Sequence, residues 1–351
     1  MKATWLGMML LLPLLTACDA RSDITINSTQ ISEQQANTIK QNIASQYPNA
    51  SAEEKQQIAD VAVKSIENLV FVEGGSFDMG DFKAPCEIPS RRRERIDWSP
   101  NNECYASLTS TLSGGMHLHK VTLDSYSIAK FETTFPDMEV MRKVNDLEIA
   151  YFDWYSGNKI KRYTKDYNHL FKVRSMSAAS TKTWQDAKDY CLWLGQVTTL
   201  PFDLPTEAQW EYAARSRGQH YYFATNTGYL QFIEGSYYNP TTGYMVDYTE
   251  DEVNAPKQIE DVDAYPPNPL GVYGMSNKVS EWVNDWYAKD YYLHSPEKNP
   301  QGPETGTEKV QRDGAGTTMT FSRLHSTIQL KQYSPSDSFR CVLQQKHSAT
   351  Q

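Results

Sequence analysis

A short apolar run that ends at a cysteine opens this chain, and it decides the compartment in which the rest must fold. Lys2 gives a positive start, residues 5–15 are almost wholly apolar, and Cys18 follows two small residues. A charged start, an apolar core of about 7–15 residues and a small-residue cleavage site are typical of a secretory signal. A membrane span would need about 20 apolar residues. We therefore predict that residues 1–17 are an export signal.

Cys18 closes a Leu-Thr-Ala-Cys sequence that resembles the bacterial lipobox. In proteins with this box the cysteine is lipidated and becomes the first residue of the mature chain. The resemblance implies a lipoprotein anchored to a membrane through Cys18 and facing the periplasm. The alternative is an ordinary signal peptide with a chance cysteine. Asp19 resembles the residue that keeps lipoproteins in the inner membrane of enteric-type bacteria, so we expect that membrane.

The charge and the remaining cysteines agree with export. The formal net charge of −9 opposes binding to nucleic acid or to anionic lipid headgroups. Besides Cys18, the cysteines are Cys86, Cys104, Cys191 and Cys341. Four cysteines can pair in three ways, and an oxidising compartment permits two disulfides. No Cys-x-x-Cys pattern occurs, so redox and zinc-ribbon sites are not indicated.

The region before residue 69 is predicted to be a tether followed by a helical hairpin. Residues 18–31 are polar and show no hydrophobic periodicity, as expected of a linker between the lipid anchor and the folded domain. Residues 32–68 hold two capping patterns, at Ser32 and Ser51, each followed by apolar residues at helical spacing. The hairpin is a spacer, a partner-binding element or a pair of helices packed on the main domain, and the sequence leaves these three open.

Residues 69–345 are predicted to form the main domain, in which short elements alternate with long loops. Strands are expected at 70–72, 76–80, 121–123, 126–128 and, closing the chain, 338–343. Helices are expected at 183–194, ended by Gly195, and at 206–215. A surface loop is expected at 81–118, which holds a basic run at 91–95. After Gly218 we expect short strands and ordered loops, and residues 219–265 are rich in Tyr, Asn and Gly.

Six segments of the main domain carry motifs in a specific order. The most specific is Leu204-Pro205-Thr206-Glu207-Ala208-Gln209-Trp210-Glu211-Tyr212-Ala213-Ala214-Arg215, and the others begin at Phe71, Val121, Trp184, Asn268 and Phe339. Together they resemble the sulfatase-modifying-factor family, the formylglycine-generating enzyme domain. The resemblance implies a loop-rich α+β fold related to C-type lectins. It also implies that Cys191 pairs with Cys341, which leaves Cys86 and Cys104 to pair locally.

The residues at the family's catalytic position do not support its chemistry. Active members hold copper(I) with two cysteines between the segment at Arg312 and the closing Cys341, and soft thiolates suit that ion. This chain has no cysteine there; the region holds Ser322, Arg323, Leu324, His325, Ser326 and Thr327. A hydroxyl or a lone imidazole cannot replace two thiolates. We therefore predict no catalytic residues and no formylglycine generation.

Other catalytic patterns are weak as well. A branch of the family that uses non-haem iron carries histidines on an added helical domain, and residues 32–68 contain none. His117 and His119 form a close pair, but a third ligand is not evident, so we interpret them as ordinary strand-end histidines. Glu207 and Glu211 lie one helical turn apart, and we interpret them as scaffold.

The family resemblance also implies a calcium site built from loop oxygens. Glu281 would supply a carboxylate, and the backbone carbonyls of Asn277 and Val279 would complete it. The side-chain ligand expected at Gly274 is missing, and the ammonium of Lys278 opposes a cation. One ligand fewer weakens a hard-cation site. Calcium is the one cofactor that the sequence suggests.

A retained scaffold without catalytic residues favours binding over chemistry. We expect a non-catalytic, periplasm-facing lipoprotein that binds a protein partner, with residues 219–265 as its recognition surface. One concrete form is an immunity protein that neutralises a toxin delivered by a secretion system, such as a lipase. The alternatives are a periplasmic metal-dependent oxidase of the same family and a binder of glycan or peptidoglycan. Metal content and binding to isolated sacculi would separate them.

Overall fold

The computed structural model describes a set of ranges that covers most of the chain: 24–88, 97–104, 112–150, 160–226, 228, 236–239, 244–247, 261–264, 266–276, 279–313, 319–327, 329–334 and 337–344. In 84–88, 97–104, 236–239, 244–247 and 329–334 it describes the backbone alone. Cys18 and Asp19 lie outside these ranges. Within them, no helix is long and apolar enough to cross a bilayer.

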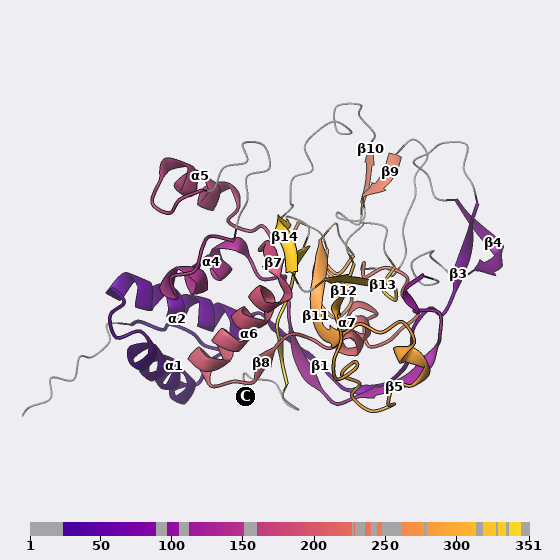
Figure 1. Cartoon of the computed structure of the whole chain (residues 1–351), viewed down its shortest axis with the longest axis horizontal. Coiled ribbons are helices and arrows are strands. Elements are labelled where there is room, and N and C mark those ends of the chain that lie inside the picture. The colour runs from indigo at the N-terminus through magenta and orange to yellow at the C-terminus, as the bar shows by residue number, and fades with distance from the viewer. Residues whose placement is uncertain are drawn as a thin grey trace, which may run out of the picture.

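A layer of helices forms one side of the molecule (Figure 1). It consists of α1 (Glu33–Gln46), α2 (Ala52–Glu67), α4 (Phe135–Val144) and α6 (Trp184–Thr198). Their apolar faces share one core, to which Ile39, Ile58, Met138 and Leu194 contribute. Side chains of α1 also donate to the last carbonyls of α6, as Asn42 does to Val197 at 2.9 Å. The predicted hairpin is therefore packed on the main domain and is not a free spacer.

Capping side chains fix where the helices begin. Ser51 and Thr183 form capping boxes with the third residue of α2 and α6, as the sequence predicts. The predicted end of α6 at Gly195 is wrong, because the helix continues to Thr198 and ends at Thr199 in the left-handed region (φ 58°). A Cβ at Gly195 would lie 3.1 Å from the carbonyl oxygen of Leu200. Glycine there lets the returning chain pack against the last turn.

Two four-stranded sheets form the other side of the molecule (Figure 1). One is antiparallel, in the order β1 (Leu69–Val72), β6 (Tyr126–Ala129), β16 (Val342–Leu343), β8 (Phe202–Asp203). The other has the order β13 (Arg323–Thr327), β12 (Glu308–Arg312), β11 (Ser280–Trp286), β15 (Asp337–Ser338), with β11 and β15 parallel. The predicted closing strand 338–343 is thus split between the sheets, because the backbone leaves one sheet at Ser338 and joins the other at Val342.

Smaller ribbons complete the described strands. They are β2 (Gly75–Met79) with β5 (His119–Leu123), β3 (Ala84–Ile88) with β4 (Asp97–Cys104), β9 (Ser236–Asn239) with β10 (Tyr244–Asp247), and β7 (Thr181–Thr183) with β14 (Gln329–Ser334). The predicted strands near 70–72, 76–80, 121–123 and 126–128 are confirmed as β1, β2, β5 and β6. The predicted loop 81–118 contains the ribbon of β3 and β4.

The second core lies around α7 (Glu207–Ala214), which is buried along its whole length. Trp210 and Ala213 of this helix pack with Phe77, Ile128 and Val283 from the strands. A helix buried on every side carries no solvent face, so its polar residues must find partners inside the protein. Those partners form the site described below.

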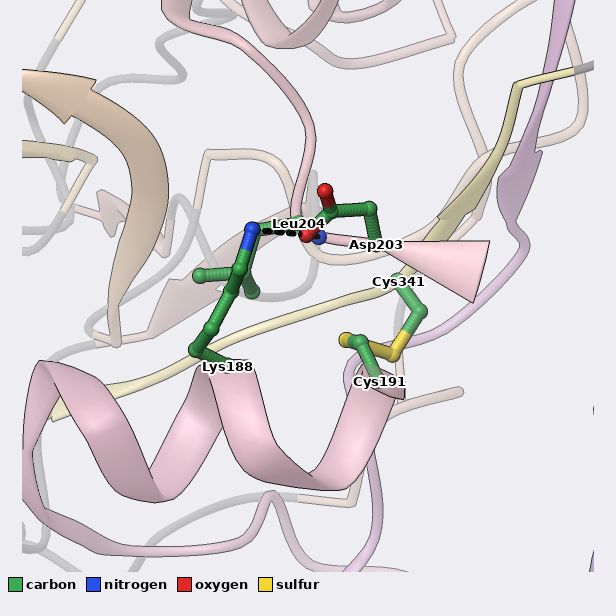
Figure 2. The surroundings of a disulfide bond; sticks show 5 residues. All are labelled: Lys188, Cys191, Asp203, Leu204 and Cys341. Atoms are coloured by element: carbon green, nitrogen blue, oxygen red, sulfur yellow. Dashed lines mark hydrogen bonds and ion pairs between the residues drawn. A yellow bond between two sulfur atoms is a disulfide. The ribbon is translucent and has the colours of Figure 1, made fainter. Parts of the chain in front are cut away.

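A disulfide joins the helical layer to the last strand. Cys191 of α6 is bonded to Cys341, with their Cα atoms 5.6 Å apart. Figure 2 shows that Lys188, one turn earlier on α6, points to Asp203, which also accepts from the backbone N–H of Leu204 at 2.7 Å. The predicted pairing of Cys191 with Cys341 is confirmed.

Two described helices, with two turns or more each, were not expected from the sequence. They are α4 and α5 (Lys165–Val173), which are capped by Thr134 and Thr164. A short 3₁₀ turn, η1 (Tyr291–Leu293), was also unexpected. In Figure 1, α5 lies at the outer edge of the helical layer, above α4.

Candidate functional site

Helix α7 presents two buried carboxylates to a cluster of arginines. Oε1 of Glu207 accepts from Nη1 of Arg312 at 2.9 Å and from Nε of Arg323 at 2.7 Å. The same oxygen accepts from the hydroxyl of Tyr292 at 3.0 Å. Burial alone would raise the pKa of Glu207, but the charges of Arg323 and Arg312 lower it below its ordinary value. Glu207 is therefore a carboxylate held between strands β12 and β13.

Glu211, one turn further along α7, extends this ion network. Its Oε2 accepts from Nη2 of Arg312 at 2.9 Å, and its Oε1 accepts from Nη1 of Arg215 at 2.7 Å and from the N–H of Gly80 at 3.1 Å. The side chains of the two ion pairs have no exposed surface. Buried charges persist only when paired and hydrogen-bonded. Burial and pairing of this kind are what the interpretation of Glu207 and Glu211 as scaffold expects.

Asp285 of strand β11 places a third carboxyl group next to the start of α7. Its Oδ2 accepts from the backbone N–H of Glu207 at 2.7 Å, which satisfies one of the free donors at the beginning of the helix. Burial, and next the charge of Glu207, raises the pKa of Asp285 to about 7. A carboxyl group that titrates near neutral pH thus lies inside the scaffold. It was not predicted from the sequence.

The stretch in which the family's cysteines were expected is tied into the same ion network. In its described part, 319–327, Ser322 and Arg323 are buried, and Arg323 is directed at Glu207. His325, two residues along β13, is exposed and stacks on Tyr287 with ring centroids 3.9 Å apart. Its Nδ1 lies 3.2 Å from a carboxylate oxygen of Glu308. These residues brace β13 against its neighbours.

The predicted calcium ligand Glu281 lies in a second buried ion cluster. Arg340 donates from Nε and Nη2 to the two oxygens of Glu281, each at 2.7 Å. Arg340 also lies 3.5 Å from the carboxylate of Glu132 and donates to the carbonyl of Tyr273 at 2.8 Å. A guanidinium that takes both oxygens of a carboxylate leaves that carboxylate poorly placed for a cation. As arranged here, Glu281 does not fit a calcium ligand.

The other predicted calcium positions supply no further ligand among the described residues. Asn277 and Lys278 lie outside the described residues, and Val279 is buried. At Gly274 (φ 68°) a Cβ would lie 2.5 Å from both carboxylate oxygens of Glu132. Glu132 therefore fills the space of the side chain that is missing at Gly274. The sequence did not reveal this, because the two residues are far apart in the chain.

The histidine pair lies at the start of β5. His119 begins the strand, and its ring centroid is 4.5 Å from that of Tyr292. Burial lowers the pKa of His119, which favours the neutral ring. In the described part of the chain, no group of three or more His, Cys, Asp or Glu side chains is arranged to hold a metal ion.

Several predicted sites fall where the structure gives no side chains. Cys86 and Cys104 lie on β3 and β4, two strands that pair along their backbones. The structure describes only the backbone of these two strands. The pairing of the two cysteines stays a prediction. The same holds for lipidation of Cys18 and for the recognition surface in 219–265, most of which lies outside the described residues.

Comparison with known proteins identifies the family of the chain. The domain described as "Sulfatase-modifying factor enzyme 1-like domain" matches residues 54–344. The chain belongs to this family. Because the match begins within α2, the second helix of the hairpin lies largely inside the family domain.

Individual relatives match shorter parts. The mouse formylglycine-generating enzyme is 34% identical over 144 residues, which is 38% of this chain and 33% of the enzyme. The serine/threonine-protein kinase pkn1 of Chlamydia pneumoniae is 25% identical over 79% of this chain and 36% of the kinase. The chain thus spans about a third of the length of these relatives. The structure of PvdO from Pseudomonas aeruginosa matches 78% of this chain and 93% of PvdO with a TM-score of 0.53 and 21% identity, which shows a shared fold.

Proposed function

We propose that this chain is a non-catalytic binding protein, anchored as a lipoprotein and facing the periplasm. Its partner is a protein, and the form we favour is immunity: the chain neutralises a toxin delivered by a secretion system, such as a lipase. One observation carries the proposal. The stretch in which the family resemblance places the reactive cysteines holds Arg323, whose side chain is fully buried against Glu207.

A catalytic position needs a reactive group that a substrate can reach. Arg323 has no exposed side-chain surface, and it cannot lose its proton in a protein. Its guanidinium holds strand β13 to helix α7, so the residue serves the scaffold. The family includes a bovine protein named "Inactive C-alpha-formylglycine-generating enzyme 2", which is 32% identical over 30% of this chain and 32% of its own length. That name supports a non-catalytic member.

The proposed location rests on the sequence and on the disulfide. The apolar run and Cys18 match a lipoprotein signal, and the bond between Cys191 and Cys341 suits an oxidising compartment. A lipid anchor on a short tether would hold the folded body next to the membrane. A membrane-directed lipase would meet it there.

Toxin protection tests this proposal. The full chain is produced in cells in which a panel of periplasm-directed lipase toxins is induced one at a time, with an unrelated lipoprotein as control. We expect survival with one toxin, and co-purification of the two proteins at a fixed ratio from detergent extracts. Killing by every toxin, with no complex of fixed ratio, would contradict the proposal.

The rival function is a periplasmic metal-dependent oxidase of the same family. It needs a bound metal ion, so metal analysis separates the two. One equivalent of copper or iron in the purified full chain, retained after dialysis, would favour the oxidase and contradict the binding proposal.

A further inference from the structure

Residues of α5 and of the helices α2 and α4 line a groove. Helix α5 lies at the outer edge of the helical layer in Figure 1. Its volume is about 330 Å³, at the lower end of the range of about 300–1,000 Å³ for small-molecule sites. The lining combines the aromatic side chains Tyr163, Tyr167 and Phe171 with the polar side chains Glu139 and Lys143. None of these residues belongs to the ion networks around α7 or Arg340.

The aromatic side chains are spaced four residues apart: Tyr167 and Phe171 lie on α5, and Tyr163 directly precedes its N-cap Thr164. The ring centroids of Tyr163 and Tyr167 are 6.3 Å apart, and those of Tyr167 and Phe171 are 5.1 Å apart. Tyr163 is 74% exposed, although its backbone is in the left-handed region with φ 66°. Bulky residues are rare in that region and persist where the surroundings impose it, often at ligand sites. Tyr163 thus offers an open aromatic face beside the groove.

Glu139 lines the groove, and within the described part of the chain only one of its two carboxylate oxygens accepts hydrogen bonds. Its side chain is 1% exposed, and its Oε1 accepts from Nε of Arg162 and from the hydroxyl of Tyr167. Among the described residues, neither Oε2 of Glu139 nor Nη2 of Arg162 has a hydrogen-bond partner. Buried polar atoms without partners are rare. Here one ion pair holds both an unused acceptor and an unused donor.

Two of the three charged side chains that line the groove are paired, and the third, Glu53, is exposed, so solvent screens its charge. Glu139 is paired with Arg162, and Lys143 is paired with Glu54 at 3.3 Å while its ammonium lies 5.7 Å from the ring of Tyr163. A strongly charged ligand would therefore gain little here. A neutral ligand with hydroxyl groups fits better, because a hydroxyl can donate to the free oxygen of Glu139.

We propose that this groove binds a neutral saccharide. A sugar ring lies against the exposed face of Tyr163, and one of its hydroxyls reaches Oε2 of Glu139. A sugar combines an apolar ring face with hydroxyl groups, which is the combination that the groove presents. This site is separate from the protein-binding function proposed above and does not depend on it.

Titration of neutral oligosaccharides against the full chain in detergent tests the site. The probes are the N-acetylglucosamine trimer and maltotriose, followed by calorimetry. We expect saturable binding of at least one probe. Tyr163→Ala should weaken it tenfold or more, whereas Tyr163→Phe, which keeps the ring, should retain it. Val173→Ala is the matched control, since Val173 is exposed on α5 but does not line the groove.

Three results would overturn the proposal. The first is no saturable binding of either saccharide by the wild-type chain at millimolar concentration. The second is saccharide binding that Tyr163→Ala leaves unchanged in a variant that unfolds like the wild type. The third is tighter, Tyr163-dependent binding of oligolysine or polyglutamate, which would make the groove a site for charged peptides.

Discussion

Removing the disulfide between Cys191 and Cys341 gives the prediction with the best-defined magnitude. The bridge joins residues 150 positions apart. In the chain-entropy model, a loop of that length constrains the unfolded chain by about 5 kcal/mol at 25 °C. Both cysteines are buried, so alanine at both positions also removes some packing. Since domains are stable by only about 5–15 kcal/mol, the double variant should lose a large share of its stability.

Urea unfolding followed by tryptophan fluorescence measures this loss. The oxidised wild-type chain is compared with the variant Cys191→Ala/Cys341→Ala at constant pH, and we expect the free energy of unfolding to fall by about 3–5 kcal/mol. The control is Cys86→Ala/Cys104→Ala. Among the described strands, β3 and β4 pair only with each other, so the control should lose less. A loss below about 1 kcal/mol in the first variant, with an unchanged urea dependence, would refute the reasoning.

Three further predictions concern the ion network and the anchor. Arg323→Leu breaks a buried pair with Glu207 and should cost about 3–5 kcal/mol in urea unfolding; an unchanged midpoint would show that the pair is not structural. Burial raises the pKa of Asp285 to about 7. This group therefore stabilises the fold at low pH, and the stabilisation is lost as the pH rises from about 4 to about 7. Asp285→Asn should abolish that part of the loss, so the free energy of unfolding of the variant should depend less on pH. Cys18→Ala should move the chain from the membrane to the soluble fraction without changing its melting temperature, and retention in the membrane would contradict lipid anchoring.

Local signals in the sequence predicted the framework of the fold. Ser51 and Thr183 were identified as helix caps because their partners lie three residues on, within reach of sequence reasoning. The family resemblance gave the bond between Cys191 and Cys341. The sequence predicts too early an end for α6, because a glycine such as Gly195 usually marks a helix end, whereas here it makes room for the chain at Leu200.

The candidate sites depend on contacts that no local pattern contains. Arg323 reaches Glu207 across 116 positions of sequence, and Glu132 fills the space above Gly274 from another part of the chain. Sequence reasoning named Glu281 as a calcium ligand because it could not show that Arg340 takes both of its oxygens. Tyr163 and Glu139 were missed for a similar reason: their groove exists only once α5 lies over α2 and α4.

Copper content and aldehyde formation, measured on one preparation, test the central claim most directly. The full chain is incubated with copper(I), oxygen and a peptide that carries cysteine, and the mouse formylglycine-generating enzyme runs alongside as a positive control. A hydrazide probe detects the aldehyde. Because no cysteine lies between Arg312 and Cys341, the stretch in which the family resemblance places the reactive pair, we predict copper far below one equivalent and no aldehyde above the buffer control. One equivalent of bound copper with aldehyde formation would contradict a non-catalytic scaffold.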